Sequence, residues 1–216
     1  MVSVRSLYQR LFRTLGPQQW WPARTSFEMM VGAILTQATN WRNVEQAIQR
    51  LRAANALHPR RMAQMPRAAL ERLIRSSGYF RQKAKRLQQF SRWYVRRYAA
   101  NPRRMFRTPW TVLRNELLAL PGIGPETADS MLLYAGRQPV FVVDAYTTRI
   151  FRRHRLIPSQ ATYAMVQALA MQQLPADITV YNESHALLVA VGKRFCHRRA
   201  PDCHRCPLGD LPHRWE

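Results

Sequence analysis

Leu120-Pro-Gly-Ile-Gly-Pro-Glu-Thr-Ala-Asp129, followed about one helix later by Val142-Val-Asp-Ala-Tyr-Thr-Thr-Arg149, is the part of the sequence that decides the fold. Pro121 and the two glycines predict a tight turn, because glycine tolerates positive φ and leaves no side chain over the backbone amides. Residues 126–135 have the pattern of a helix, whose positive N-terminus would meet the turn. The stretch therefore predicts either a phosphate-like anion site or no more than a connection between two helices.

The charge of the chain favours a polyanionic partner. The 216 residues include 34 Lys plus Arg and 12 Asp plus Glu, which gives a formal net charge of +22. Such an imbalance repels itself unless something neutralises it, so nucleic acid is the favoured partner. The sequence has no long apolar run and no signal-like N-terminus, which argues against a membrane protein. We expect a soluble, cytoplasmic, nucleoid-associated protein.

The apolar pattern predicts an all-α protein of about ten short helices. Hydrophobic residues make up 47% of the chain, enough for a real core. Only residues 139–143 resemble a strand, and one short strand cannot found a sheet. Apolar residues at helical spacing occur in residues 4–12, 44–51, 70–74 and 87–95.

Three motifs in order resemble the helix-hairpin-helix (HhH-GPD) DNA glycosylases of the endonuclease III superfamily, and the likeness extends over almost the whole chain. Ile34-Leu-Thr-Gln-Ala-Thr-Asn40 is similar to the family's early helix motif, and Gly78-Tyr-Phe-Arg-Gln-Lys-Ala84 to its second DNA-facing loop. Residues 120–144 are similar to its hairpin and catalytic aspartate. The resemblance implies two helical domains flanking a DNA-binding cleft, a monomer, and double-stranded DNA containing damaged bases as partner.

The resemblance also implies the domain boundaries. It places a six-helix module at residues 24–132, with the helix-hairpin-helix at about 112–135. Residues 1–23 together with 133–216 would form a second helical module that carries a C-terminal three-cysteine loop. The hairpin and Asp144 would lie at the cleft.

Asp144 follows an apolar run and precedes a helix, so the residues alone allow it to be simply a helix cap. With the hairpin at the family's spacing, catalysis becomes the better interpretation. Cleavage of an N-glycosidic bond develops positive charge on the sugar, which a carboxylate stabilises while it activates the attacking water. We therefore take Asp144 as the main catalytic residue.

Glu126 departs from the pattern of endonuclease III, whose matching position carries the lysine that forms a Schiff base with the sugar. A carboxylate cannot do that chemistry, and a first-turn acid is also what a helix dipole favours. We count Glu126 with Asp144 among the catalytic-site residues. Lys193 remains as a substitute amine and as a DNA-binding residue, but the simpler interpretation is a monofunctional glycosylase without AP-lyase activity.

The aromatic residues predict which base is removed. Trp20 and Trp21 before a proline, with Trp41 after the early motif, resemble the superfamily's 3-methyladenine DNA glycosylase branch. Alkylated purines are cationic, and an indole face attracts them by stacking and cation–π contact, worth roughly 0.5 to 2 kcal/mol each. The alternative is that these rings belong to the core. Trp21 and Trp41 are the preferred pair, with Trp20 beside or behind them.

A flipped base leaves a gap in the stack, at a cost of about a few kcal/mol. The family pattern implies that Gln37 enters this gap and that Tyr79 faces the partner base, although either residue could serve the core instead. We expect phosphate contacts from Lys and Arg flanking the cleft and from the hairpin amides, and a monovalent cation at the hairpin carbonyls is implied by the family. The expected contacts are Lys83, Lys85, Gly122 and Gly124.

Cys196, Cys203 and Cys206 have three quarters of the family's iron–sulfur spacing, and Pro212 stands at the fourth position. A 4Fe–4S cluster or a zinc ion needs four ligands, and His213 is one residue late but near enough to serve, with His197 and His204 as alternatives. A 4Fe–4S cluster, a zinc ion and no metal all remain open.

Three functions stay in play. The first is a monofunctional glycosylase for alkylated purines. The second is an endonuclease III-like glycosylase that cleaves strands at oxidised pyrimidines, and the third is a non-catalytic DNA-binding relative. The sequence does not rank 3-methyladenine against 7-methylguanine, hypoxanthine or a mismatched base, because the shape of the pocket decides that.

Overall fold

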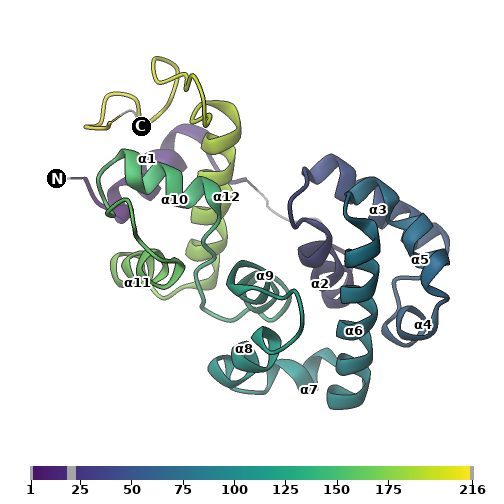
Figure 1. The fold of residues 1–216 in the computed structure, drawn as a ribbon. Coiled ribbons are helices and arrows are strands. Elements are labelled where there is room, and N and C mark those ends of the chain that lie inside the picture. The colour runs from purple at the N-terminus through teal and green to yellow at the C-terminus, as the bar shows by residue number, and fades with distance from the viewer. Residues whose placement is uncertain (1, 19–22, 215–216) are drawn as a thin grey trace. The chain divides into compact units, whose positions relative to one another are not determined.

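The computed structural model of the chain describes residues 2–18 and 23–214, and within them every regular element is a helix (Figure 1). The all-α fold predicted from the sequence is confirmed. The strand-like stretch 139–143 is an irregular segment in which residues 140–143 are buried. No helix of the described residues is long and apolar enough to cross a membrane.

The chain divides into two compact units. Residues 23–138 form one, here called the central unit, and residues 1–22 with 139–216 form the other, here called the terminal unit. The helices of the central unit are α2 (Ser26–Leu35), α3 (Trp41–Ala53), α4 (Pro59–Gln64), α5 (Arg67–Leu73), η1 (Arg75–Ser77), α6 (Phe80–Tyr98), α7 (Pro102–Phe106), α8 (Trp110–Leu118), α9 (Pro125–Ser130) and η2 (Met131–Ala135). Those of the terminal unit are α1 (Val4–Leu15), α10 (Ala145–Arg153), α11 (Tyr163–Gln173) and α12 (Ile178–Arg194).

The core of the central unit lies where α2 meets α6. Every residue of α2 after Ser26 is buried, and all of them are apolar or glycine except Glu28, which pairs with Arg52 at 2.8 Å. α6 is polar except for one stripe, and its Phe90 and Tyr94 stack on Phe27 of α2 with ring centroids 6.5 and 6.1 Å apart. Aromatic pairs of this kind contribute about 0.5–1.5 kcal/mol beyond their burial. This packing fixes α6, which supports the hairpin.

The hairpin joins α8 to α9, and a bidentate ion pair ties the two helices together. Arg114 donates from Nε to Asp129 Oδ1 at 2.6 Å and from Nη2 to Oδ2 at 3.1 Å. The Asp129 side chain is fully buried, at 0% exposed, so its charge has to be compensated inside the protein, and this ion pair does so. The pair holds both ends of the turn in register.

The helix predicted for residues 126–135 changes its winding half-way. α9 ends at Ser130, and η2 continues as a π-helical turn that the Gly136 amide closes by donating to Met131 O at 3.0 Å. The wider turn packs on α2 with Met131, Leu132 and Leu133 all buried. Such single π turns occur mainly inside or at the end of α-helices.

In the terminal unit, α12 packs against α10 and α1. Gly192 of α12 allows α10 to approach closely, because a Cβ there would lie 2.2 Å from Cδ1 of Tyr146. Arg153 of α10 ties the chain after α12, since its Nη1 donates to Cys196 Sγ at 3.1 Å and to His197 O at 2.8 Å. The C-terminal loop is therefore anchored on α10.

Candidate functional site

The hairpin turn leaves two backbone amides available. Gly122 has φ of 79°, a conformation that favours glycine, whereas Gly124 has φ of −93°, open to any residue. The Ile123 amide donates to Leu120 O at 3.1 Å. Among the described residues, the Gly122 and Gly124 amides have no such acceptor, and Gly122 is exposed. The turn therefore offers two donors of the kind that a phosphate accepts from.

Gln37 lies against this turn. Its Nε2 donates to the Gly122 carbonyl and to Thr127 Oγ1, both at 2.9 Å, and its Oε1 accepts from Nη1 of Arg86. The sequence predicted that Gln37 belongs to the DNA-facing surface, but it did not predict the contact of Gln37 with Arg86. In this structure, the Gln37 side chain connects the turn after α2 to the hairpin, so its role as a wedge in DNA stays a prediction.

Tyr79 and Lys83 flank the start of α6 and have opposite surroundings. Tyr79 is 67% exposed, with φ of 46° after Gly78 at 66°, so the loop presents its ring to solvent. Lys83 is 1% exposed, and its ammonium donates to Leu35 O at 2.9 Å and Ser77 O at 2.6 Å. The prediction that Lys83 contacts phosphate is wrong for this structure, because its ammonium is enclosed and bonded to two carbonyls. Lys85 is exposed.

Asp144 is the N-cap of α10, so the capping alternative is confirmed. Its Oδ1 accepts from the Thr147 amide at 2.7 Å, and its Oδ2 lies 3.6 Å from Nε2 of His185 on α12. The cap leaves the role in catalysis open, because Oδ2 is not used by it.

The ionisation of Asp144 is set by its neighbours. Burial by itself raises the pKa of the carboxyl group, but the neighbouring His185 side chain and the hydrogen bonds from Thr147 outweigh burial. The pKa therefore lies below its usual value, and Asp144 is a carboxylate at neutral pH. Its side chain remains 11% exposed, which leaves a small part of it accessible.

Glu126 and Lys193, the acid and the amine that bear on lyase activity, are both exposed. Glu126 is exposed in the first turn of α9, where endonuclease III carries its lysine, and Lys193 is exposed near the end of α12. Lys193 and Glu126 belong to different units. The α9 segment Pro125–Ser130 itself contains no lysine.

The tryptophans are only partly described. Trp41 is half-buried as the first residue of α3, directly after the N-cap Asn40. Trp20 and Trp21 lie outside the described residues. The base pocket built from these three rings therefore stays a prediction.

The three cysteines line one small cavity of about 20 Å³ together with His154 and His213. Burial raises the pKa of the Cys206 thiol to about 11 and also raises that of the Cys203 thiol. Within the described residues no group of three or more His, Cys, Asp or Glu is arranged to hold a metal ion. The cavity has room for little more than a water molecule. With Pro212 at the fourth position, these residues do not fit a four-cysteine iron–sulfur cluster.

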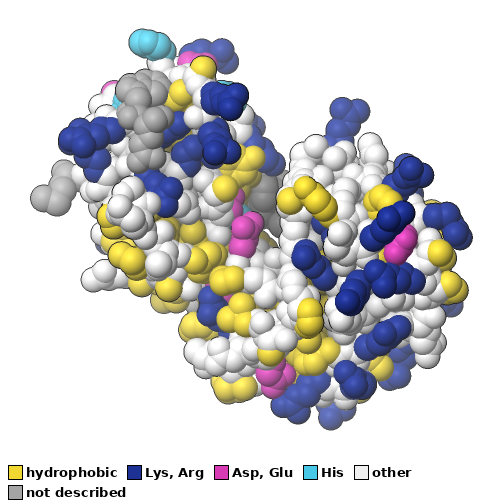
Figure 2. Space-filling model, viewed as in Figure 1, with side chains coloured by type: hydrophobic (Ala, Val, Ile, Leu, Met, Phe, Trp, Pro, Cys, Tyr) yellow, Lys and Arg dark blue, Asp and Glu magenta, His cyan; other side chains and the backbone are white. Residues whose placement is uncertain are grey.

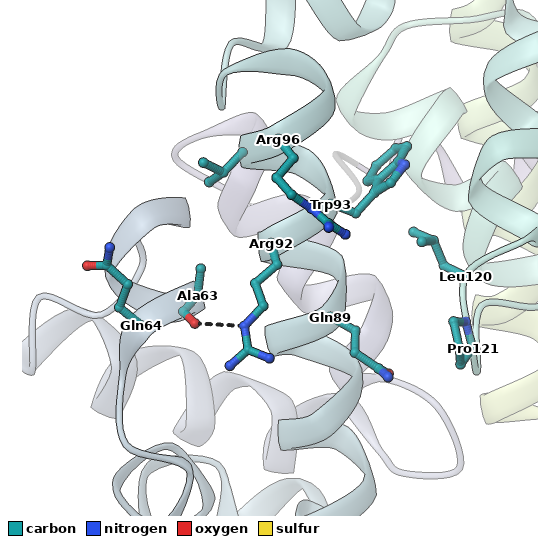
Figure 3. A pocket seen from close by; sticks show the side chains of 9 residues that line it. Ala63, Gln64, Gln89, Arg92, Trp93, Arg96, Leu120 and Pro121 are labelled. Atoms are coloured by element: carbon teal, nitrogen blue, oxygen red, sulfur yellow. Dashed lines mark hydrogen bonds between the residues drawn. The ribbon is translucent and has the colours of Figure 1, made fainter.

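Basic side chains are spread over one face of the central unit. Figure 2 shows Lys and Arg over much of the face that this unit presents, with few acidic side chains among them. A groove of about 650 Å³ runs between α4, α6 and the start of the hairpin turn. In Figure 3, Arg92 extends from α6 toward α4, where its Nε donates to Ala63 O at 3.1 Å, and Trp93 extends on the side where Leu120 and Pro121 lie. The described residues that line it include no acid, histidine or cysteine, the usual groups for acid–base chemistry.

Comparison with known proteins shows to which family the chain belongs. The family model for HhH-GPD superfamily base excision DNA repair proteins matches residues 31–176, which include Gln37, the hairpin and Asp144. The chain belongs to the HhH-GPD superfamily. Members of this family act in base excision repair, and the chain is a DNA N-glycosylase, a hydrolase of N-glycosyl bonds.

Individual relatives agree with this family. A putative DNA repair glycosylase of Methanocaldococcus jannaschii is 42% identical over 210 residues, which cover 96% of this chain and 94% of the relative. Endonuclease III of Thermotoga maritima is 30% identical over 182 residues, 84% of this chain and 80% of that protein. The crystal structure of the H. pylori 3-methyladenine DNA glycosylase bound to 1,N6-ethenoadenine matches with a TM-score of 0.78 and 25% identity, covering 89% and 98% of the two chains.

The sequence did not predict three residues that contact the candidate site of this HhH-GPD protein, namely His185, Arg86 and Arg114. His185 sits in an apolar helix and gave only the weak signal of a lone histidine among buried residues. Arg86 and Arg114 were hidden among 34 basic residues. Their partners are 49 and 15 residues away in the chain, so no local pattern points to them.

Proposed function

We propose that the chain removes a damaged base, an alkylated purine, by hydrolysing its N-glycosidic bond, and leaves the DNA strand uncut. The observation that carries the proposal is Asp144, a largely buried carboxylate that His185 and Thr147 keep ionised. Glu126 in the first turn of α9 supports the monofunctional mode, because a carboxylate cannot form a Schiff base.

In the proposed reaction, the bond between the sugar C1′ and the base nitrogen lengthens and positive charge develops on the sugar. The Asp144 carboxylate stabilises that charge and accepts a proton from the attacking water, whose oxygen bonds to C1′. The pair of electrons of the broken bond leaves with the base. A cationic alkylated purine departs as a neutral molecule, so no acid has to protonate it.

The choice of alkylated purines draws on two observations. The H. pylori protein, whose structure matches 89% of this chain, is a 3-methyladenine DNA glycosylase bound to 1,N6-ethenoadenine. Trp41 is half-buried at the start of α3, four residues after Gln37, where an indole face could meet a cationic base. Trp20 and Trp21 complete the pocket in this proposal.

The likeness to endonuclease III favours a second candidate, a glycosylase with AP-lyase activity on oxidised pyrimidines. That function needs an amine nucleophile, for which Lys193 and Lys85 are exposed. The two candidates differ in covalent chemistry, because only the second passes through a Schiff base that borohydride reduces.

The test is a panel of duplexes carrying single lesions, with base release and strand breakage measured separately. We expect release of 3-methyladenine from methylated DNA, no strand break before alkali, and no borohydride-trapped complex on an abasic duplex. A trapped complex would establish the endonuclease III-like function. Tight binding with no release from any lesion would establish a non-catalytic relative and refute the proposal.

A further inference from the structure

Arg86 of α6 lies directly over the hairpin glycine. A Cβ at position 122 would lie 2.1 Å from Arg86 Nε and 2.8 Å from its Cζ, so the guanidinium occupies the space that any other residue would fill. Glycine at 122 thus serves two purposes, the positive φ and the close approach of an arginine. The contact places a permanent positive charge beside the free Gly122 amide.

The guanidinium is held in this place by Gln37. Arg86 Nη1 donates to Gln37 Oε1 at 2.5 Å, while Gln37 Nε2 donates to the Gly122 carbonyl. The amide can be oriented only this way, because the flipped form would set its NH₂ against the guanidinium and its oxygen against a carbonyl. Arg86, Gln37 and the turn therefore form one connected unit.

The charge of Arg86 is not neutralised by the protein. In the part of the chain that the structure describes, Arg86 has no carboxylate within 4.0 Å, in contrast to Arg114 and Arg97, which pair with Asp129 and Glu116. Its side chain is half-buried, which limits the orientations it can take. Gln37 uses one of its five N–H donors, and the side chain has others left for an anion.

We propose that Arg86 is a phosphate-binding residue of the hairpin, which grips the same DNA phosphate as the Gly122 and Gly124 amides and is aimed by Gln37. This inference rests on DNA being the partner, as in the proposed function, but not on which base is removed. A positioned guanidinium can bind a phosphate through two N–H groups, which a lone turn cannot match.

The test measures binding of the full chain to an undamaged fluorescent duplex at a series of KCl concentrations. Each phosphate contact contributes about 0.9 to the slope of log K against log salt. Arg86→Ala should therefore lower the magnitude of the slope by about 0.9 and weaken binding about five- to tenfold near 0.1 M salt. Arg86→Lys should keep the slope, because the charge remains.

Gln37→Glu gives a second, independent variant. It places a carboxylate on the guanidinium, so it should lower the slope as Arg86→Ala does, although Arg86 is intact. The control is Arg103→Ala, which removes an exposed arginine from α7, the helix after the far end of α6. That variant should leave the slope unchanged.

Two results would overturn the inference. One is a loss of affinity in Arg86→Ala with an unchanged slope, and the other is an Arg86→Lys variant with the slope of Arg86→Ala. Either would make Arg86 a brace of the hairpin, and if Arg86→Ala does not fold, Arg86→Lys and Gln37→Glu decide alone. Base release from methylated DNA is assayed separately, so a chain that releases nothing but loses slope in Arg86→Ala refutes only the proposed function.

Discussion

The hairpin and the Asp144 site are built on different principles. The hairpin presents backbone amides and fixed charges, held by the Arg114–Asp129 pair and the Gln37–Arg86 contact. The Asp144 site relies on one titratable group, whose state depends on His185 and Thr147. We therefore expect the hairpin to lose DNA affinity gradually as the side chains that hold it are removed one by one. The Asp144 site should lose its activity with a single side chain.

Asp144→Asn should show the largest effect. Asparagine caps a helix as well as aspartate, so the free energy of unfolding should change little. Base release should fall about 10²- to 10⁴-fold, because the amide neither stabilises the charged sugar nor accepts the proton. Single-turnover release from methylated DNA measures this, with DNA affinity as control. Release within about threefold of the original chain would remove Asp144 from the reaction.

Arg114→Ala tests the hairpin through its support instead of its contacts. Removing the arginine takes this bidentate partner away from the buried Asp129 carboxylate, so unfolding should become easier by about 3–5 kcal/mol. Urea denaturation followed by circular dichroism measures the loss. Arg97→Ala is the matched control, since its pair with Glu116 is exposed and should contribute less than about 1 kcal/mol. Equal losses in the two variants would contradict this account of the hairpin.

The two glycines offer an internal comparison. Gly122→Ala forces a Cβ into Arg86 at positive φ, which should cost about 1–3 kcal/mol of stability and disturb DNA binding. Gly124→Ala meets no atom within 4 Å and has φ of −93°, so the fold should accept it. Thermal unfolding of both variants, with DNA affinity measured beside it, checks the difference. Similar behaviour of the two would show that Arg86 moves aside at little cost.

His185→Gln should have the smallest effect at neutral pH, about two- to tenfold on base release. Without the histidine, burial raises the pKa of Asp144 with less to oppose it. The group must be deprotonated to act, so the acidic limb of the rate profile should move to higher pH. Rates measured across an acidic to neutral pH series test this, and an unmoved limb would mean that His185 only fills space.

The outcome for individual residues shows what the sequence could predict. The turn at Gly122 and the cap at Asp144 are local features, so they can be predicted from their residue types. Lys83 was misplaced because a long aliphatic stem can be buried once its ammonium finds acceptors, and those acceptors lie on Leu35 and Ser77.

Tertiary contacts account for the rest. The tie between Gln37 and Arg86 and the approach of His185 to Asp144 join residues 49 and 41 positions apart, and only the packed helices bring them together. The π turn of η2 is also invisible in the sequence, because its residues have the composition of an ordinary helix. The residue types of the site could thus be predicted from the sequence. The side chains from other helices that hold them in place could not.

The enclosed amine of Lys83 has a consequence for the proton balance of folding. Burial, and secondarily the charge of Arg86, lower its pKa from 10.5 to about 8, so the folded chain holds this proton less tightly than the unfolded chain does. Below pH 8 the protonated amine opposes folding. As the pH rises from about 8 to 10.5 that penalty is relieved, because the unfolded chain still binds the proton that the folded chain has released. The connection between α2 and the Tyr79 loop should therefore be more stable in mildly alkaline solution than at neutrality.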